Sequence, residues 1–384
     1  MVMKITSIDV YKVKPRWIFL KIGTDEGIYG WGELISGTKT ETVVAGVKEI
    51  GETLIGKDPM QIEDIWQTLY RSFFRGGPIN MTIVSGVEMA LWDIKGKYFN
   101  IPVYEFLGGR ARERIMVYSW IGGDRPGKSV VEEALDRKSK GFKAIKMNAT
   151  SELHYVDSFK KVDEVLERVD AIRNAVGYDL EIGVDFHGRV HKPMAKVLAK
   201  ELEQYRPMFI EEPVLPENNQ ALAEIASHTS IPIATGERLY TRWGFKDVFK
   251  MGLVDIIQPD VAMTGGILET KKIAAMAEAF DIAVAPHAPY GPVALAATLQ
   301  LDSCTPNVFI QEQSLGIHYN MGFDLLDFVR NKEIFNYKDG FVDVPKGPGL
   351  GIEIDEELVK QVAEEGLKWT NPKWRNYDGT IAEW

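Results

Sequence analysis

The chain has 384 residues, a formal net charge of −10 and a single cysteine, Cys304. This length allows two domains with substantial cores, while the acidic balance argues against a nucleic-acid or anionic-membrane surface, since both require a clustered basic face. One cysteine excludes an internal disulfide and is typical of a reducing compartment. Because no run approaches the ~20 apolar residues of a membrane span and the N-terminus lacks a signal-peptide pattern, we expect a cytoplasmic protein.

The first part of the chain predicts an α+β domain. Alternating apolar residues predict three strands, Lys4–Val13, Trp17–Thr24 and Ile28–Leu34. Helical spacing then predicts three helices, Thr40–Ile55, Met60–Phe74 and Met81–Phe99. Strands followed by helices are typical of an α+β unit. The glycines of Leu107-Gly108-Gly109 break the pattern, so we expect this domain to cover residues 1–112.

From residue 113 to about residue 330, strands and helices alternate. The predicted strands are Ile115–Trp120, Ala144–Met147, Glu181–His187, Met208–Glu212, Ile231–Glu237, Val254–Asp260, Ile282–His287 and Val308–Gln313. The predicted helices between them are Ser129–Gly141, Tyr155–Val176, Pro193–Tyr205, Asn219–Ser227, Arg242–Met251, Leu268–Phe280 and Val293–Leu301. Seven helices joining eight strands predict an α/β fold, a (β/α)7β TIM-like barrel with an N-terminal α+β capping domain.

Most of the later strands end in an ionisable residue. These residues are Asp185, Glu211, Glu237, Asp260, His287 and Glu312, separated by 23 to 27 positions. Active sites of such barrels lie at the C-terminal ends of the strands, so we expect these side chains to surround one site. After Leu326 the pattern becomes irregular, and we expect residues 331–384 to pack back on the capping domain.

These motifs carry a resemblance to a known family. The runs that carry it include Arg75-Gly76-Gly77-Pro78, Gly122-Gly123-Asp124-Arg125-Pro126, Asp185-Phe186-His187-Gly188-Arg189 and Glu211-Glu212-Pro213-Val214. An α+β cap, a (β/α)7β barrel and one acidic ligand on each of three consecutive strands resemble the enolase superfamily, mandelate racemase branch. The resemblance covers nearly the whole length and implies a symmetric homo-oligomer.

Three carboxylates, those of Asp185, Glu211 and Glu237, end consecutive strands. Together they can stay ionised only around a cation, and hard oxygen ligands suit Mg²⁺, one per subunit. Pairing with lysines is the alternative, yet Lys146 alone cannot neutralise three acids. The resemblance assigns the metal ligand to Glu211, and we expect Glu212, of opposite pleat, to point into the helical shell.

Two histidines are candidates for acid and base. His287 ends the seventh strand next to Asp260 on the sixth, and a carboxylate can hold an imidazole in the tautomer that a general base needs. His187 lies four strands away, across the barrel, and could protonate a leaving hydroxyl or merely hydrogen-bond near the metal. The branch's second lysine base is absent, because the sequence here is Lys146-Met147-Asn148.

The remaining site residues are predicted to hold the substrate or its charge. The resemblance assigns Glu312 to stabilise an enediolate oxygen, which requires it to be largely protonated. Lys146, Asn148, Arg16 and Arg238 are candidates for contacting the substrate, although an arginine after a strand end is as often a structural ion pair. Specificity is expected from the loops Arg16 to Phe19 and Ser36 to Thr40.

These residues predict Mg²⁺-dependent dehydration of a small acid sugar to a 2-keto-3-deoxy acid. In this scheme His287 removes the C2 proton and His187 protonates the C3 hydroxyl as it leaves. An epimerase that uses both histidines as opposed bases is the main alternative. A catalytically idle barrel would not need ionisable residues at successive strand ends.

Overall fold

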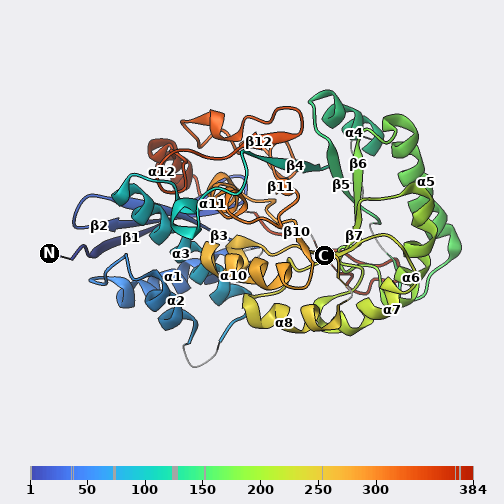
Figure 1. Ribbon diagram of the computed structural model, residues 1–384, viewed down its shortest axis with the longest axis horizontal. Coiled ribbons are helices and arrows are strands. Elements are labelled where there is room, and N and C mark those ends of the chain that lie inside the picture. The colour runs from blue at the N-terminus through green and yellow to red at the C-terminus, as the bar shows by residue number, and fades with distance from the viewer. Residues whose placement is uncertain are drawn as a thin grey trace.

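The structure is a computed structural model. It describes residues 2–35, 37, 39–71, 75–122, 129–150, 153–252, 254–367, 369–371 and 373–383. Figure 1 shows the N-terminal strands and helices on one side of the molecule and the strands of the barrel, with their covering helices, on the other.

The N-terminal part is the α+β unit that the sequence predicts. Its antiparallel meander consists of β1 (Ile5–Val13), β2 (Trp17–Thr24) and β3 (Tyr29–Leu34). Three helices follow, namely α1 (Thr40–Leu54), α2 (Ile62–Tyr70) and α3 (Pro78–Phe99). The predicted end of the second helix, at Phe74, lies outside the described residues.

Helix α3 lies directly on β3 because two glycines leave room for it. A Cβ atom on Gly30 would come within 2.0 Å of the main-chain oxygen of Ala90, and one on Gly32 within 2.0 Å of that of Gly86. No larger residue fits at either position without separating the strand from the helix. This close contact makes α3 the central helix of the capping unit, with most of its residues buried.

Eight parallel strands form the predicted barrel. They are β4 (Arg114–Trp120), β5 (Ala144–Asn148), β6 (Glu181–Asp185), β7 (Phe209–Glu211), β8 (Ile233–Thr235), β9 (Ile256–Ile257), β10 (Ala283–Val284) and β11 (Gln311–Gln313). The order follows the chain from β4 to β10, and β11 pairs with β4. A bridge between Val284 and Val308 joins β10 to the segment entering β11, so the ring closes.

The predicted crossover helices are present around the barrel. They are α4 (Val130–Ser139), α5 (Phe159–Val176), α6 (Lys192–Glu201), α7 (Leu222–Ala226), α8 (Thr241–Met251), α10 (Ile267–Glu278) and α11 (Pro292–Ser303). The sequence did not predict the short helix α9 (Val261–Thr264), which follows β9 directly. In the described parts of the chain, no helix combines the length and apolar character needed to cross a membrane.

Small and large side chains alternate in the barrel interior. Tyr118, Phe209 and Ile310 pack there with Ala144 and with other buried apolar residues of neighbouring strands. Gly183 makes room for the ring of Phe209, since a Cβ at residue 183 would lie 2.7 Å from that ring. The interior is therefore a packed core, and the cavity lined by ionisable residues lies at the end of the strands.

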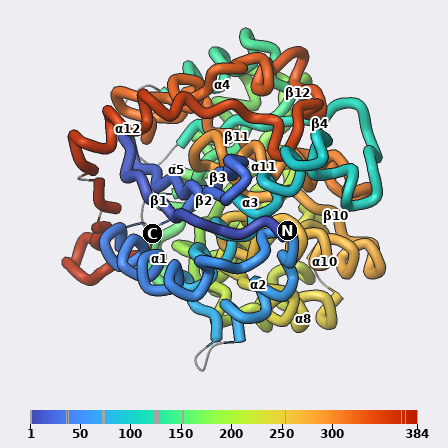
Figure 2. The backbone as a smooth tube through the Cα atoms, turned by 90° about the vertical axis from the view of Figure 1, so that its left-hand side faces the viewer, coloured from blue at the N-terminus to red at the C-terminus, as the bar shows by residue number. Residues whose placement is uncertain are grey.

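The C-terminal part divides between the barrel and the cap. Strand β12 (Phe341–Asp343) pairs antiparallel with β4. Helix α12 (Glu356–Glu364) lies against the meander, where Lys21 Nζ is 2.7 Å from Glu356 Oε2; Figure 2 shows this helix beside the N-terminal strands. The division of the chain at residues 112 and 330 stays a prediction.

Two buried glutamates join the cap to the barrel. Glu88 of α3 accepts hydrogen bonds from the main-chain N–H groups of Ile267 (2.7 Å) and Leu268 (2.9 Å), at the start of α10. Glu33 of β3 accepts from those of Gly291 (2.7 Å) and Ala294 (2.9 Å), at the start of α11. Each carboxylate satisfies N–H groups that a helix leaves unpaired at its N-terminus.

Candidate active site

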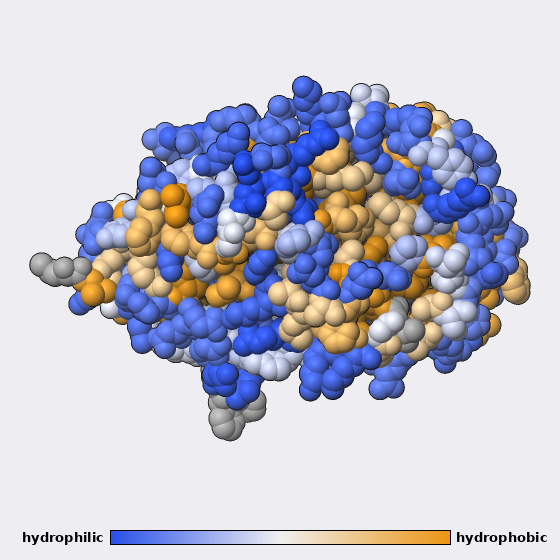
Figure 3. Space-filling view, in the orientation of Figure 1, coloured by the Kyte–Doolittle hydropathy of each residue, from blue (hydrophilic) through white to orange (hydrophobic). Residues whose placement is uncertain are grey.

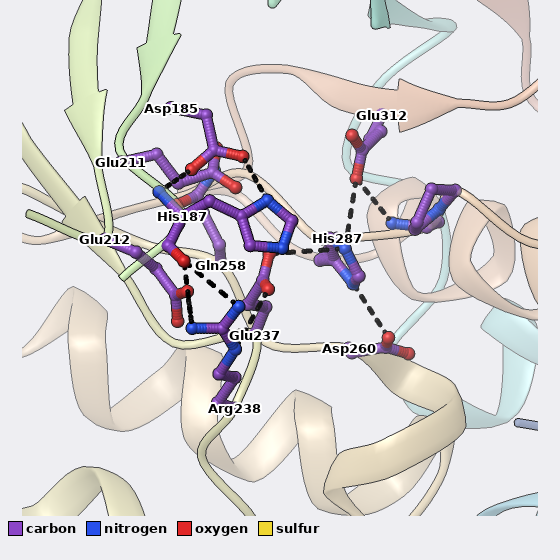
Figure 4. Close-up of polar contacts among 12 residues, drawn as sticks. Asp185, His187, Glu211, Glu212, Glu237, Arg238, Gln258, Asp260, His287 and Glu312 are labelled. Atoms are coloured by element: carbon purple, nitrogen blue, oxygen red, sulfur yellow. Dashed lines mark hydrogen bonds and ion pairs between the residues drawn. The ribbon is translucent and has the colours of Figure 1, made fainter. Parts of the chain in front are cut away.

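Ionisable side chains gather at the C-terminal end of the barrel strands, around a cavity of about 250 Å³. The predicted residues that line it are Arg16, Lys146, Asp185, His187, Glu237, Arg238, His287 and Glu312. Three further predicted residues are buried: Asn148 at the end of β5, Glu211 at the end of β7 and Asp260 just after β9. Figure 4 shows most of this cluster, with the two histidines projecting toward its middle. The structure thus brings the predicted set together.

Lys146 lies between two carboxylates. Its Nζ is 2.7 Å from Glu211 Oε1 and 2.9 Å from Glu312 Oε1. Burial by itself lowers the pKa of Lys146, but Glu211 and Glu312 raise it well above its usual range, so the amine stays charged. The second oxygen of Glu211 accepts a hydrogen bond from Gln258 Nε2 at 2.5 Å.

His287 is held by Asp260. Its Nδ1 lies 2.9 Å from Asp260 Oδ2, and Asp260 Oδ1 accepts from the N–H of Ala262 at 2.8 Å, which fixes the carboxylate at the start of α9. The other ring nitrogen, Nε2, faces the cavity, 3.3 Å from Glu237 Oε2 and 3.9 Å from Glu312 Oε2. An imidazole bound in this way presents Nε2 to a substrate.

His187 stands where regular strand geometry has ended. β6 stops at Asp185, two residues before the predicted end, because His187 has a φ of 53°. Asp185 holds it twice: Oδ1 accepts from the N–H of His187 at 2.7 Å, and Oδ2 lies 3.2 Å from the ring Nδ1. Because β6 and β10 are four strands apart in a ring of eight, the two histidines enter the cavity from opposite sides.

Arg238 is engaged by protein atoms. Its Nη1 lies 2.9 Å from Glu212 Oε2, and both Nη1 and Nη2 donate to the main-chain oxygen of His187 at 3.3 Å. The expectation that Glu212 points into the helical shell is wrong, because its φ of 41° ends the alternation of β7 and the carboxylate pairs with Arg238 instead. The structural ion pair that was the alternative for Arg238 is therefore present.

Arg16 and Asn148 occupy different depths. The guanidinium of Arg16 lies in the cavity wall, donates to the main-chain oxygen of Pro289 and sits 5.2 Å from the ring centre of Tyr319. Asn148 is buried and accepts from Trp120 Nε1 at 3.3 Å. Both residues lie at the same end of the barrel as the histidines.

The predicted specificity loops are only partly loops. β2 begins at Trp17, and residues 17 to 19 are fully buried core, so of that segment only Arg16 reaches the cavity. In the other segment, Gly37 lines the cavity, while Ser36 and Thr38 lie outside the described residues, as does much of the run from Gly122 to Pro126.

Several residues that line the cavity were not predicted from the sequence. Tyr290, Tyr319, Trp369 and Asn371 line the cavity, and no strand pattern marks them because they lie in loops and in the irregular C-terminal part. Gln258 could have been found, since it lies two positions before Asp260 in the predicted strand Val254–Asp260 and therefore on the same face of that strand.

The donor set suits a hard cation, although the side chains do not converge as they stand. In the described ranges, no group of three acidic, histidine or cysteine side chains is arranged to hold a metal ion. Asp185, Glu211 and Glu237 instead face His187, Lys146 and His287 respectively. Burial raises the pKa of Glu211 well above its usual range, Lys146 opposes this, and the charges of Asp185 and Glu237 add to the rise. A divalent cation would relieve that repulsion, so the residues fit Mg²⁺ chemically.

Two family models match the chain. Residues 4–108 match the mandelate racemase / muconate lactonizing enzyme N-terminal domain, and residues 129–358 match the enolase C-terminal domain-like family. Together they cover the cap and nearly all of the barrel.

Known proteins resemble the chain over its full length. It is 52% identical over 383 residues to a D-galactonate dehydratase of Ralstonia pickettii (strain 12J), and 52% identical to one of Variovorax paradoxus (strain S110), with all of both chains covered in each case. Among solved structures, a member of the enolase superfamily from Salmonella Typhimurium has a TM-score of 0.84 at 33% identity, covering 94% of this chain and 98% of that one. A mandelate racemase/muconate lactonizing enzyme-like protein from Roseovarius sp. TM1035 has a TM-score of 0.85 at 31% identity, covering 93% and 95%.

Proposed function

The chain belongs to the mandelate racemase / muconate lactonizing enzyme family of the enolase superfamily, and from this membership we propose that it dehydrates a sugar acid, D-galactonate, to a 2-keto-3-deoxy acid. The relatives at about half identity over their full length are named for that activity. The observation that carries the proposal is the pair of histidines on opposite sides of one cavity, each of them bound by a carboxylate.

His287 is the proposed base. Because Asp260 binds Nδ1, Nε2 is the atom that accepts the C2 proton, and the electron pair of the C–H bond passes into the substrate to give an enediolate. Asp260 then stabilises the imidazolium that forms.

His187 is the proposed acid. It donates a proton to the C3 hydroxyl, the C3–O bond breaks, and water leaves as the electrons of the enediolate form the C2–C3 double bond. The enol that remains tautomerises to the 2-keto-3-deoxy acid. Since the two histidines belong to strands on opposite sides of the barrel, we expect anti elimination.

The other residues have supporting roles in the proposal. Lys146 and Arg16 supply positive charge for the substrate carboxylate and hydroxyls, Asn148 supports the floor of the site, and Glu312 lies beside the developing enediolate oxygen. Asp185, Glu211 and Glu237 would hold one Mg²⁺, which supplies Lewis-acid stabilisation of negative charge on the substrate carboxylate when bound.

A cytoplasmic location and a homo-oligomeric assembly complete the proposal. The small-molecule substrate and the reducing environment that one cysteine indicates suit the cytoplasm. Figure 3 shows apolar side chains gathered in a band across the middle of one face, with hydrophilic side chains around it. Such a band suits the proposed homo-oligomer.

The test is the variant His187→Asn. We expect it to lower the formation of 2-keto acid by about 10²–10⁴-fold, the effect of losing a general acid. Exchange of the C2 proton with solvent deuterium should persist, because His287 remains. A substrate with fluoride at C3 should recover much of the loss, since fluoride needs less protonation to leave.

The opposite result would assign a different function to the protein. If the wild-type enzyme inverts C2 without forming a 2-keto acid, and the fluoride analogue gives no recovery in the variant, His187 is a second base. The protein is then an epimerase.

A further inference from the structure

We infer that Arg238 and Glu212 form a clamp that positions His187 for proton transfer to the leaving group; this inference rests on the proposed function. Arg238 is thereby a positioning residue, and its guanidinium acts on the backbone of His187. Figure 4 shows the arginine between the carboxylate of Glu212 and the carbonyl of His187.

The clamp holds the peptide bond that follows His187 at both ends. Its oxygen accepts two hydrogen bonds from Arg238, at 3.3 Å from Nη1 and 3.3 Å from Nη2. Its N–H, that of Gly188, donates to the main-chain oxygen of Glu212 at 3.0 Å. The preceding N–H, that of His187 itself, donates to Asp185. The direction of the His187 side chain is therefore set by three residues at the ends of three neighbouring strands, Asp185 of β6, Glu212 after β7 and Arg238 after β8.

This support has a physical reason. A histidine at a φ of 53° is in the left-handed region, which is unfavourable for a non-glycine residue and persists only where the surroundings impose it. Gly188, at a φ of 64°, continues the bend, and a Cβ there would lie 2.6 Å from Arg238 Nη1. Glycine at residue 188 thus lets the guanidinium reach the carbonyl.

Glu212 keeps the arginine in place. Its carboxylate is 1% exposed and lies 2.9 Å from Arg238 Nη1. The N–H of Glu212 donates to the oxygen of Ala234 at 2.9 Å, which ties the clamp to β8. The remaining nitrogen of the guanidinium, Nε, lies 3.6 Å from Glu237 Oε1. Because Arg238 binds these groups, a direct role on the substrate carboxylate is not needed to explain why it lines the cavity.

The experiment compares Arg238→Met and Glu212→Gln with His187→Asn. Misplacing a catalytic group by about 1 Å can cost up to about 10²-fold in rate, so Arg238→Met should lower 2-keto acid formation from D-galactonate by about ten- to a hundredfold. Exchange of the C2 proton with deuterium should stay close to the wild-type rate. With the 3-fluoro analogue as substrate, Arg238→Met should lower the rate of elimination much less than it does with D-galactonate. Glu212→Gln should act in the same direction, more weakly.

A matched pair elsewhere in the chain provides the control. Arg242 pairs with Glu269, and the side-chain exposures of 24% and 1% nearly equal the 23% and 1% of Arg238 and Glu212. Arg242→Met and Glu269→Gln therefore remove a buried ion pair of the same kind without touching His187. We expect both controls to leave the ratio of elimination to exchange unchanged.

A failure of the clamp and a failure of the proposed function give different results. If Arg238→Met lowers elimination and exchange by the same factor, or leaves both unchanged, the clamp is wrong. Because Glu237 lies beside Arg238, Mn²⁺ binding to the Arg238→Met variant is also titrated and followed by electron paramagnetic resonance. A fall in metal affinity large enough to account for the lost rate would also overturn the clamp. If His187→Asn lowers elimination and exchange equally, His187 is not the acid, and this result overturns the proposed function together with the clamp that depends on it.

Discussion

A single imidazole shows how strongly its neighbours set the chemistry of the cavity. Burial alone lowers the pKa of His287, but Glu237, then Glu312 and Asp260, raise it to about 10. A base must be neutral to accept a proton. A cation held by Glu237 would offset the first of these charges, so the proposed metal also prepares the proposed base.

At the same scale, we expect Glu237→Gln to weaken metal binding. The substitution keeps the size of the side chain but removes one of three negative charges that suit Mg²⁺. Isothermal titration with Mg²⁺ should show a clear loss of affinity, and circular dichroism should show that the metal-free variant is folded. Glu312→Gln is the control, because Glu312 is buried at the same strand ends but is not a proposed ligand. Equal affinities in the two variants would contradict the assignment.

Among the elements, the contact between α3 and α10 depends on the charge of Glu88. Burial raises the pKa of this carboxyl to about 7 from 4.5, and the N–H groups of Leu268 and Ile267 oppose the rise. The folded state therefore keeps a proton that the unfolded state has lost between these pH values. Stability from this group is full at acid pH and falls as the pH rises toward 7.

We expect Glu88→Gln to remove this dependence. The loss in the wild type is on the order of 3 kcal/mol in the free energy of unfolding between pH 4.5 and 7. Glutamine carries no charge at any of these pH values, so the stability of the variant should not change with pH through this group, whereas that of the wild type should fall. Chemical denaturation of both proteins across this range measures the difference. Parallel curves would show that Glu88 is ionised throughout.

Element types were predictable from the sequence because periodicity reports burial, and burial here follows a regular barrel. The ends of the strands were not. The alternation predicted a strand up to His187, but the strand ends at Asp185 because His187 adopts a left-handed conformation that turns the chain. Glu212 turns the chain after β7 in the same way. No pattern of apolar residues encodes such a bend, because tertiary contacts impose it on residues that do not favour it.

On the scale of the whole molecule, the cavity is built from distant parts of the chain. Arg16 enters from the cap, the histidines from the barrel and Trp369 from the C-terminal part. The guanidinium of Arg16 lies 5.2 Å from the ring centre of Tyr319 and 5.9 Å from that of Trp369. The residues of the barrel and Arg16 were predicted from the sequence, whereas Trp369 was not, since it lies in the irregular C-terminal part, outside any periodic segment.

We expect Trp369→Ala to raise the KM for D-galactonate about fivefold, because a cation–π contact of about 1 kcal/mol holds Arg16 against this ring. Steady-state kinetics measure the change, and kcat should move less than KM. Trp374→Ala is the control in the same segment, since Trp374 packs near Arg189, away from Arg16. An equal rise in both variants would mean that the C-terminal part acts only through its overall packing.

A site closed by both early and late residues also imposes an order on biosynthesis. Arg16 leaves the ribosome before the barrel and Trp369 leaves it after the barrel, while the segments between them can fold as they emerge. The polypeptide thus acquires its barrel before its substrate pocket is complete. In a nascent chain that has not yet reached residue 369, we expect the barrel to fold while the cavity wall still lacks Trp369 and Asn371.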